Sequence, residues 1–477
     1  MKTKQKLLFT VFFFILQYIS FAKPANDEPG EQGGNYQREN NVPNNACISH
    51  GQYLLIENNC REHSKLFSRN RHSQNAASSV SLTWPLRAGA GLTDCSYYYI
   101  SAHVDQDTAA TTFRDYNCGS IAYDGHKGTD IAIGPFPFLK MDNNEVEVVA
   151  AAAGTIVDKH DGEYDRNCVG VGSGLTANYI ILQHSDGSHT LYWHMKSNSL
   201  TAKTNGQTVA AGEFLGVVGS SGSSSGCHLH FEVWSGSTSS TVVDPFSGSC
   251  NHLNATSWWA VQKQYTEPSV IKASVHTTDV TMPPCPQTET PNESQSYSIP
   301  FQGAGLSPGY AKFYIFMRNE TSGTTVNMRI LNPNSTVFNS WTHVCSNTYK
   351  FSYWNYSKLL PTIPGTYIFQ AIYNSDTCTK QFTITTTTGV LEVSTDFTGI
   401  HVYPNPARSV ATIALNQKPI HGELKIYNVL GQIRKTITNI SGTEIQFDAT
   451  GLTSGIYFIY LAEDNKIIDK GRFLIVD

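Results

Sequence analysis

Short apolar runs that alternate with polar residues, separated by glycine-rich turns, recur along most of this 477-residue chain. Between about Ser81 and Trp259 these runs include VEVVAAAAGTIV, NYIILQH, HTLYWHM and GEFLGVVG. Successive side chains of a β-strand point to opposite faces, so the alternation predicts half-buried strands, and the three-to-four-residue spacing of amphipathic helices is rare. We therefore expect a mainly β protein in which antiparallel sheets dominate.

Composition divides the chain into five segments. Three early lysines, the apolar run LLFTVFFFIL and small residues at positions 20 and 22 predict a secretory signal peptide over residues 1–22. Residues 23–79 are rich in Asn, Gln and Ser, which favours a pro-segment or linker over a domain. The rest is predicted to form an antiparallel β-sheet domain over residues 80–260, an immunoglobulin-like β-sandwich over 275–388 and a small β-sandwich over 398–477.

Charge and cysteine content limit the partners and the compartment. A net charge of -5 and a pI near 6.3 offer no basic surface for nucleic acid, so none is expected as a partner. Beyond the signal peptide no apolar run is long enough to span a membrane, so we expect no membrane span in the mature protein. Ten cysteines in an exported chain predict disulfides, and their even number fits a fully oxidised set whose pairing stays open.

The stretch GCHLHFEVW, residues 226–234, places two histidines one residue apart in a predicted strand. Strand geometry puts His228, His230 and Glu232 on one face and the apolar residues between them on the other. The apolar face can pack on a core, which leaves the other face for chemistry. Glu232 can support this site or simply be solvated, and the sequence leaves both open.

A second pair of candidate ligands, His126 and Asp130, lies in YDGHKGTDIAIGPF, where Gly128 eases the turn between them. An imidazole and a carboxylate are ligands that zinc accepts. His103 and Asp107 in HVDQD have the same spacing, but only Asp130 opens an apolar run that can hold a ligand rigidly. We therefore favour His126 and Asp130 and expect HVDQD to be a solvated loop.

Several longer motifs follow one another in a recognisable order: HKGTDIAI, VVAAAAGTI, YIILQHSDG, LYWHM, GVVGSSGSSSGCHLHFEV and VVDPF. In order and spacing they resemble the lysostaphin-type zinc endopeptidases over about residues 81–250. The resemblance implies the lysostaphin-like fold, a duplicated hybrid motif, and one Zn²⁺ per chain. It implies His126, Asp130 and His230 as the zinc ligands, and His194 and His228 as the catalytic histidines that face the metal-bound water.

Such a ligand set suits peptide hydrolysis. Three protein ligands leave the fourth position of zinc for water, whose pKa can fall to ~7, and two histidines can donate hydrogen bonds and shuttle protons. The expected function is a secreted zinc endopeptidase that acts on peptidoglycan cross-bridge peptides or Gly-rich proteins. The alternative is a non-catalytic relative that binds cell walls or regulates another hydrolase. A serine or cysteine hydrolase lacks a nucleophile motif here.

Residues around these motifs carry further expectations. His184 is expected to support the site, His189 to lie on the surface, and the Ser/Gly stretch 219–226 to form a loop at the rim of the cleft. Cys227 stands where relatives commonly have proline, and we expect it to pair with a cysteine such as Cys250. Pro-segments of relatives close the cleft, but residues 23–79 show no recognisable group that would block zinc.

The end of the chain contains VYPNPARSVATI, LKIYNVLGQ and DATGLTSGIYFI. Their order resembles the carboxy-terminal sorting domain of the type IX secretion route. The resemblance implies export to the periplasm, passage across the outer membrane with the type IX machinery as partner, and a final location outside the cell or on its outer surface.

Overall fold

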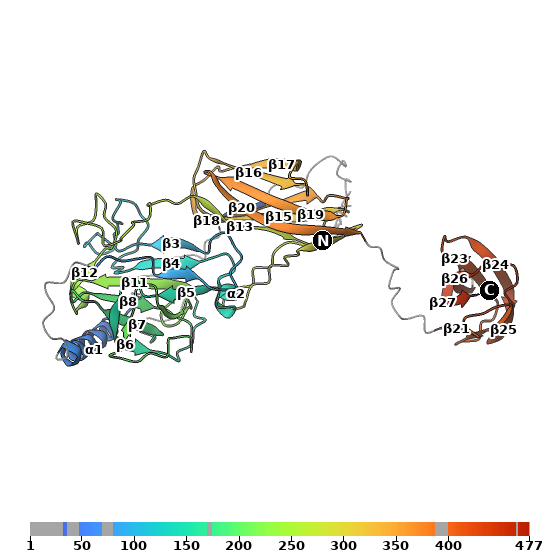
Figure 1. Cartoon of the computed structure of the whole chain (residues 1–477), viewed down its shortest axis with the longest axis horizontal. Coiled ribbons are helices and arrows are strands. Elements are labelled where there is room, and N and C mark those ends of the chain that lie inside the picture. Colours follow the sequence, from blue (N-terminus) through green and yellow to red (C-terminus); the bar gives the residue numbers. More distant parts are fainter. Residues whose placement is uncertain are drawn as a thin grey trace, which may run out of the picture. The chain divides into compact units, whose positions relative to one another are not determined.

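The structure is a computed structural model, which describes residues 32–35, 47–68, 80–168, 174–386, 399–463 and 466–476. It divides into two compact units, Met1–Thr386 and Thr387–Asp477, and most of the regular secondary structure in both is β-strand (Figure 1). The prediction of a mainly β protein is confirmed. The predicted signal peptide lies outside the described residues, and the predicted domain boundaries stay predictions.

An eight-stranded antiparallel sheet organises the first β domain, with the order β3-β4-β11-β8-β7-β6-β9 and β12 paired to β11. Its strands are β3 (Tyr98–Ala102), β4 (Thr129–Ile133), β6 (Gly154–His160), β7 (Tyr179–Gln183), β8 (His189–Trp193), β9 (Thr208–Val209), β11 (His228–Trp234) and β12 (Val242–Val243). A smaller antiparallel sheet, ordered β10-β5-β2, comprises β2 (Leu86–Ala88), β5 (Val146–Val149) and β10 (Phe214–Val217). A short helix, α2 (Pro137–Asp142), precedes β5.

The two faces of the large sheet pack against different partners. Leu229, Phe231 and Val233 of β11 belong to the main core of the domain, as the alternation predicts. Trp234 of the same strand belongs to a second apolar cluster on the other face, together with residues of helix α1 (His50–Ser68). The sheet is therefore covered on both faces, and α1 covers the face that carries the histidines of β11.

Helix α1 lies in the segment 23–79, for which the sequence predicts no ordered domain. A reciprocal cap starts it: Ser49 Oγ accepts from the Gln52 backbone N–H at 3.3 Å, and Gln52 Oε1 accepts from the Ser49 N–H at 2.8 Å. Tyr53, Ile56 and Cys60 are buried at a spacing of three and four residues. Because the segment is mostly polar in composition, its sequence did not predict a helix with this short row of apolar side chains.

Two sheets form the sandwich that follows the first domain, as predicted. They are ordered β1-β18-β15-β13 and β14-β20-β19-β16-β17, and the pair β14–β20 is parallel. The strands are β1 (Gln32–Asn35), β13 (Ser269–His276), β14 (Ser296–Ile299), β15 (Tyr310–Glu320), β16 (Thr325–Leu331), β17 (Val337–Val344), β18 (Tyr349–Leu359), β19 (Gly365–Tyr373) and β20 (Asp376–Thr386). Phe313 packs edge-on against Phe369 and Phe382 between the sheets.

The second unit is a small antiparallel sandwich with sheets ordered β21-β22-β25 and β24-β23-β26-β27. Its strands are β21 (Ile400–Tyr403), β22 (Val410–Leu415), β23 (Gly422–Asn428), β24 (Ile433–Ile440), β25 (Glu444–Asp448), β26 (Gly455–Glu463) and β27 (Lys466–Ile475). Ile413, Ile426 and Ile459 are fully buried in its core. No helix in the described part of the chain combines the length and apolar character needed to cross a membrane.

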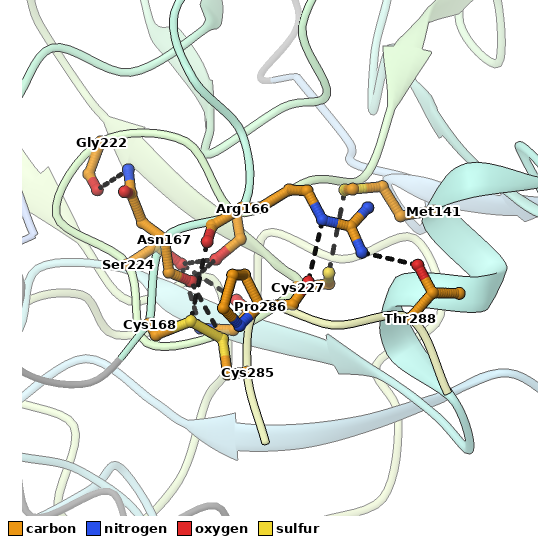
Figure 2. The surroundings of a disulfide bond; sticks show 12 residues. Met141, Arg166, Asn167, Cys168, Gly222, Ser224, Cys227, Cys285, Pro286 and Thr288 are labelled. Carbon is orange, nitrogen blue, oxygen red and sulfur yellow. Dashed lines mark hydrogen bonds between the residues drawn. A yellow bond between two sulfur atoms is a disulfide. The ribbon is translucent and has the colours of Figure 1, made fainter. Parts of the chain in front are cut away.

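Disulfide pairing departs from expectation in two ways. Disulfides join Cys95 to Cys378, Cys118 to Cys250, and Cys168 to Cys285. The prediction that Cys227 pairs with Cys250 is therefore wrong. Figure 2 shows Cys227 beside Met141 instead. Cys227 Sγ lies 3.9 Å from the thioether sulfur of Met141, and the Cys227 side chain is part of the main apolar core.

The prediction of a fully oxidised cysteine set is also wrong. Four cysteines take part in no disulfide: Cys47, Cys60, Cys227 and Cys345. The last three are buried, and Cys47 is only partly buried.

Candidate metal centre

Neighbouring strands bring the predicted ligands together. In the antiparallel pair β4–β11, Asp130 lies directly opposite His230, and His230 in turn lies opposite Trp193 of β8. His194 follows Trp193 at the end of β8. Residues that lie up to a hundred positions apart in the sequence therefore meet on one face of the sheet.

His126, Asp130 and His230 form a tight triangle of potential ligand atoms. His126 Nε2 lies 3.1 Å from Asp130 Oδ1 and 3.1 Å from His230 Nδ1, and His230 Nδ1 lies 2.8 Å from Asp130 Oδ1. In a tetrahedral zinc site with bonds of 2.0–2.1 Å, ligand atoms lie about 3.3 Å apart. The three side chains therefore have the spacing of one face of a tetrahedral metal site.

Outer hydrogen bonds turn both imidazoles of the triangle toward its centre. His126 Nδ1–H donates to the backbone carbonyl of His103 at 2.7 Å, which leaves Nε2 as the ligand atom. His230 Nε2–H donates to Glu232 Oε1 at 2.9 Å, which leaves Nδ1. Burial alone would raise the pKa of Asp130, but the imidazoles of His126 and His228 hold it well below its usual value. A donor set of two imidazoles and one carboxylate fits a divalent metal.

Gly128 lets the chain pass close to the ring of His230. A Cβ at this position would lie 2.7 Å from His230 Cε1 and 2.9 Å from the Phe231 carbonyl oxygen. Contacts this short require backbone or ring to shift, so no larger residue fits here without moving a potential ligand. The close approach of the chain to the His230 ring thus requires a glycine here, in addition to the turn that the sequence predicts.

His194 and His228 lie beside the triangle, with ring centroids 4.6 Å apart. His194 Nδ1–H donates to the Ser221 carbonyl at 2.6 Å and His228 Nδ1–H to the Gly226 carbonyl at 2.8 Å. Neither Nε2 atom has a hydrogen-bond partner within the described residues, although both are buried. The Ser/Gly loop 219–226 therefore holds both rings through its carbonyls.

His194 also has an unusual backbone conformation, with φ of 65°. A non-glycine residue in this left-handed region costs of order 1 kcal/mol or more, and such residues concentrate at functional sites. Burial lowers the pKa of the His194 imidazole, which favours its neutral form. This ring is therefore a preorganised proton acceptor beside the triangle.

Three other sequence expectations can be compared with the structure. Glu232 is fully buried and accepts from His230 and from Trp234 Nε1 at 2.7 Å, so it supports the site. His189, expected on the surface, is buried and its Nδ1–H donates to the Gly236 carbonyl. His184 is buried and bonded to the Ala153 carbonyl and Thr190, outside the triangle.

The expectation of a solvated loop at HVDQD is wrong for His103. Its ring is buried, with edge-on contacts to Tyr116 and Phe246 at centroid distances of 4.9 Å. Its carbonyl accepts the hydrogen bond that orients His126. The His103 side chain is thus part of the core, and its backbone supports a candidate ligand.

Two residues beside the triangle were missed by sequence reasoning. Tyr123 stacks on His126 with centroids 4.1 Å apart, and its hydroxyl donates to Asp130 Oδ2 at 3.2 Å. Cys47 Sγ lies 2.9 Å from the Tyr123 hydroxyl, and within 4.8 Å of each ligand atom of the triangle. Residues 23–79, in which the sequence shows no recognisable group that would block zinc, thus place a thiol beside the candidate ligands. Cys47 could have been singled out in the sequence because a thiol is a strong zinc ligand.

Family models match two parts of the chain. Residues 124–245 match Peptidase family M23, and residues 401–476 match the Secretion system C-terminal sorting domain. The first match contains His126, Asp130, His194, His228 and His230, and the second spans the Cys-free unit at the end of the chain. Both resemblances inferred from the sequence are confirmed at this level.

Individual relatives share only parts of this chain. An uncharacterized metalloprotease of Haemophilus influenzae is 32% identical over 107 residues, which are 22% of this chain and 18% of the relative. The chain therefore spans less than a fifth of that relative's length.

Two solved structures are also similar. The catalytic domain of lysostaphin from Staphylococcus simulans is 27% identical, covering 26% of this chain and 77% of that chain, with a TM-score of 0.19. A zinc containing peptidase from Vibrio cholerae is 20% identical, covering 38% of this chain and 41% of that chain, with a TM-score of 0.23.

Proposed function

We propose that this chain, which carries a Peptidase family M23 domain and a carboxy-terminal sorting domain of the type IX secretion route, is a secreted zinc endopeptidase. The observation that carries the proposal is the triangle of His126 Nε2, Asp130 Oδ1 and His230 Nδ1, whose edges measure 2.8–3.1 Å. The sorting domain directs the chain to the cell surface or the extracellular space. The substrates we propose are peptidoglycan cross-bridge peptides or Gly-rich proteins, on the resemblance of the sequence motifs.

Zinc suits the donor set. Two imidazoles and one carboxylate are borderline ligands that zinc binds well, and three protein ligands characterise catalytic zinc sites. When bound, zinc would supply Lewis acidity that polarises a peptide carbonyl and lowers the pKa of a water molecule. His126, Asp130 and His230 would hold it, and Glu232 would keep His230 in the tautomer that presents Nδ1.

His194 and His228 would manage the protons of the reaction. Each ring is fixed by an Nδ1–H bond to a loop carbonyl and directs Nε2 toward the triangle. One Nε2 can take the proton of the attacking water, and an Nε2–H can stabilise the oxygen of the scissile carbonyl and protonate the leaving amine. Tyr123, whose hydroxyl reaches Asp130, can add a second donor at the carbonyl.

The test combines metal content with identification of cleaved bonds. The exported protein and the full chain are incubated with peptidoglycan, pentaglycine or elastin, and new amino termini are identified. We expect cleavage in at least one substrate, about one zinc per chain, and loss of both in His126→Ala and His230→Ala. His160→Ala, a half-exposed histidine of the same domain, is the matched control and should retain both.

Two outcomes would contradict the proposal. Cleavage that survives removal of the metal would point to a different mechanism. Tight binding of peptidoglycan with no new termini from the exported, metal-loaded protein would instead favour the non-catalytic, wall-binding alternative.

A further inference from the structure

Cys47 lies beside all five histidine and aspartate residues of the candidate centre. Its Sγ is grouped with the ligand atoms of His126, Asp130 and His230, all within 4.8 Å of one another, and separately with those of His194 and His228. The proposed reaction uses no thiol. This sulfur therefore lies close enough to the three candidate ligand atoms to bind the same metal ion.

The segment that carries Cys47 is built into the domain. Immediately after Cys47, Ile48 is buried in the apolar cluster on the histidine-bearing face of the sheet. Ser49 and Gln52 then cap α1, whose Tyr53 and Ile56 join the same cluster. We call residues 47–68 the covering segment.

Polar contacts also anchor the covering segment. Gln52 Nε2 donates to the Leu175 carbonyl at 2.9 Å, and Asn59 Nδ2 donates to Asp158 Oδ2 at 3.0 Å. The position of Cys47 thus follows from a capped and packed helix at its carboxyl side. The two proposed catalytic histidines are buried beneath the segment, His194 fully and His228 with 8% exposed, as expected for a site that this segment covers.

We infer that Cys47 is the fourth metal ligand in the full-length chain and keeps it inactive. The inference rests on the proposed zinc function. Zinc binds thiolates strongly, and a set of two histidines, one aspartate and one cysteine is a closed four-coordinate site of the structural kind. A site closed in this way has no position for the water that hydrolysis requires.

The bonds that join the covering segment to the domain indicate how the enzyme would be activated. Cys47 takes part in no disulfide, and neither does Cys60, so no covalent bond other than the main chain joins the covering segment to the domain. Hydrolysis of one peptide bond on the carboxyl side of α1 would leave only noncovalent contacts. When the segment departs, water replaces the thiolate, which is protonated in solvent.

Cobalt substitution tests the ligand directly. The full chain and the variants Cys47→Ala, Cys47→Ser and Cys60→Ala are each loaded with one equivalent of Co²⁺. Cys60 is the matched control because it lies on the same segment and is buried away from the metal ligands. We expect a near-ultraviolet thiolate-to-cobalt charge-transfer band in the full chain and in Cys60→Ala, and its loss in Cys47→Ala and Cys47→Ser. Visible cobalt bands should persist in all four proteins.

A small probe tests whether the coordination position is closed. Acetohydroxamate, which binds an open cobalt position, should leave the visible spectrum of the full chain unchanged and shift that of Cys47→Ala. A charge-transfer band unchanged by Cys47→Ala, or an equal response of both proteins to acetohydroxamate, would overturn the inference while leaving the metal site intact. Absence of visible cobalt bands in every protein would overturn the proposed metal function itself.

Discussion

Tyr53 donates a 2.5 Å hydrogen bond to Glu232 Oε1, the same carboxylate oxygen that accepts from His230 Nε2 at 2.9 Å. Burial and the nearby Glu232 charge raise the pKa of Tyr53 well above its usual value, so its hydroxyl stays protonated and remains a donor. Lys127 Nζ lies 4.4 Å from the centre of the Tyr53 ring. One side chain of the covering segment thus touches the group that orients a proposed ligand.

Tyr53→Phe should loosen the covering segment. A hydrogen bond to a charged acceptor stabilises by about 1.5–3 kcal/mol, so losing it should raise the open population of the segment about tenfold or more. Hydrogen exchange of backbone amides in residues 53–65 measures this opening. Leu54→Ala, at a side chain that is 54% exposed on the same helix, is the control and should exchange at the wild-type rate. Equal exchange in Tyr53→Phe would mean that this bond does not hold the segment.

Glu232→Gln should weaken metal binding without removing a ligand. The amide can accept from His230 or Tyr53, but its NH₂ group then faces the Trp234 Nε1–H donor. Loss of the carboxylate that orients a ligating histidine typically costs 10–100-fold in metal affinity. Zinc affinity is measured by competition with a chelator of known strength. Glu213→Gln, whose carboxylate is bonded at the surface to Lys203, should bind zinc as the wild type does.

The sequence was informative wherever the interaction is local or periodic. Alternation along β11 places His228 and His230 on one face whatever the rest of the fold is, because the period of two is a property of the strand itself. The same pattern assigns Phe231 to the core, where it is fully buried.

Contacts across long sequence separations were not predictable from the pattern. Cys47 meets Tyr123 across 76 positions and Cys118 pairs with Cys250 across 132, and neither spacing has a periodic signature. His103 was assigned to solvent because no apolar run follows it. Its ring is instead buried by aromatic side chains from distant segments.

His103 should make the stability of the first domain depend on pH. Burial lowers its pKa to about 3, whereas an unfolded histidine titrates near 6.5. Below pH 6.5 the unfolded chain takes up a proton on this histidine that the folded chain does not. The contribution of the neutral, buried His103 to the free energy of unfolding is therefore present above pH 6.5 and is lost as the pH falls toward 3. Between pH 7 and pH 4 the wild type should lose about 3 kcal/mol more unfolding free energy than His103→Phe.

Urea unfolding with a chelator present, so that metal release does not contribute, measures this difference. His160→Phe, at a side chain that is 41% exposed, should follow the wild type at both pH values. A constant difference between His103→Phe and wild type from pH 7 to pH 4 would show that the buried ring is not the source.

The disulfide between Cys118 and Cys250 should stabilise the region before His126. It closes a loop of 132 residues, and Asp115, three positions before Cys118, accepts backbone bonds from Gly119 and Ile121. Replacing both cysteines by alanine should lower the unfolding free energy by about 2–5 kcal/mol. Urea unfolding at neutral pH measures it, and an unchanged midpoint and slope would contradict the prediction.

His194→Asn should separate proton transfer from metal binding. Asparagine tolerates the left-handed backbone that His194 adopts at φ of 65°, so the substitution removes the imidazole without adding backbone strain. Loss of a general acid or base should lower kcat by about 10²–10⁴-fold. Zinc content should stay at the wild-type level because His194 Nε2 belongs to no edge of the ligand triangle.

The measurement compares kcat and zinc content of the exported proteins after cleavage on the carboxyl side of α1 has released the covering segment. His228→Gln should behave like His194→Asn, because both rings present Nε2 to the same space. His126→Ala should instead lose zinc and activity together, since it removes a proposed ligand. If His194→Asn and His228→Gln both keep kcat within a few fold of the wild type, these two histidines do not move the protons. The donor and acceptor would then have to be sought at Tyr123, whose hydroxyl also lies beside Asp130.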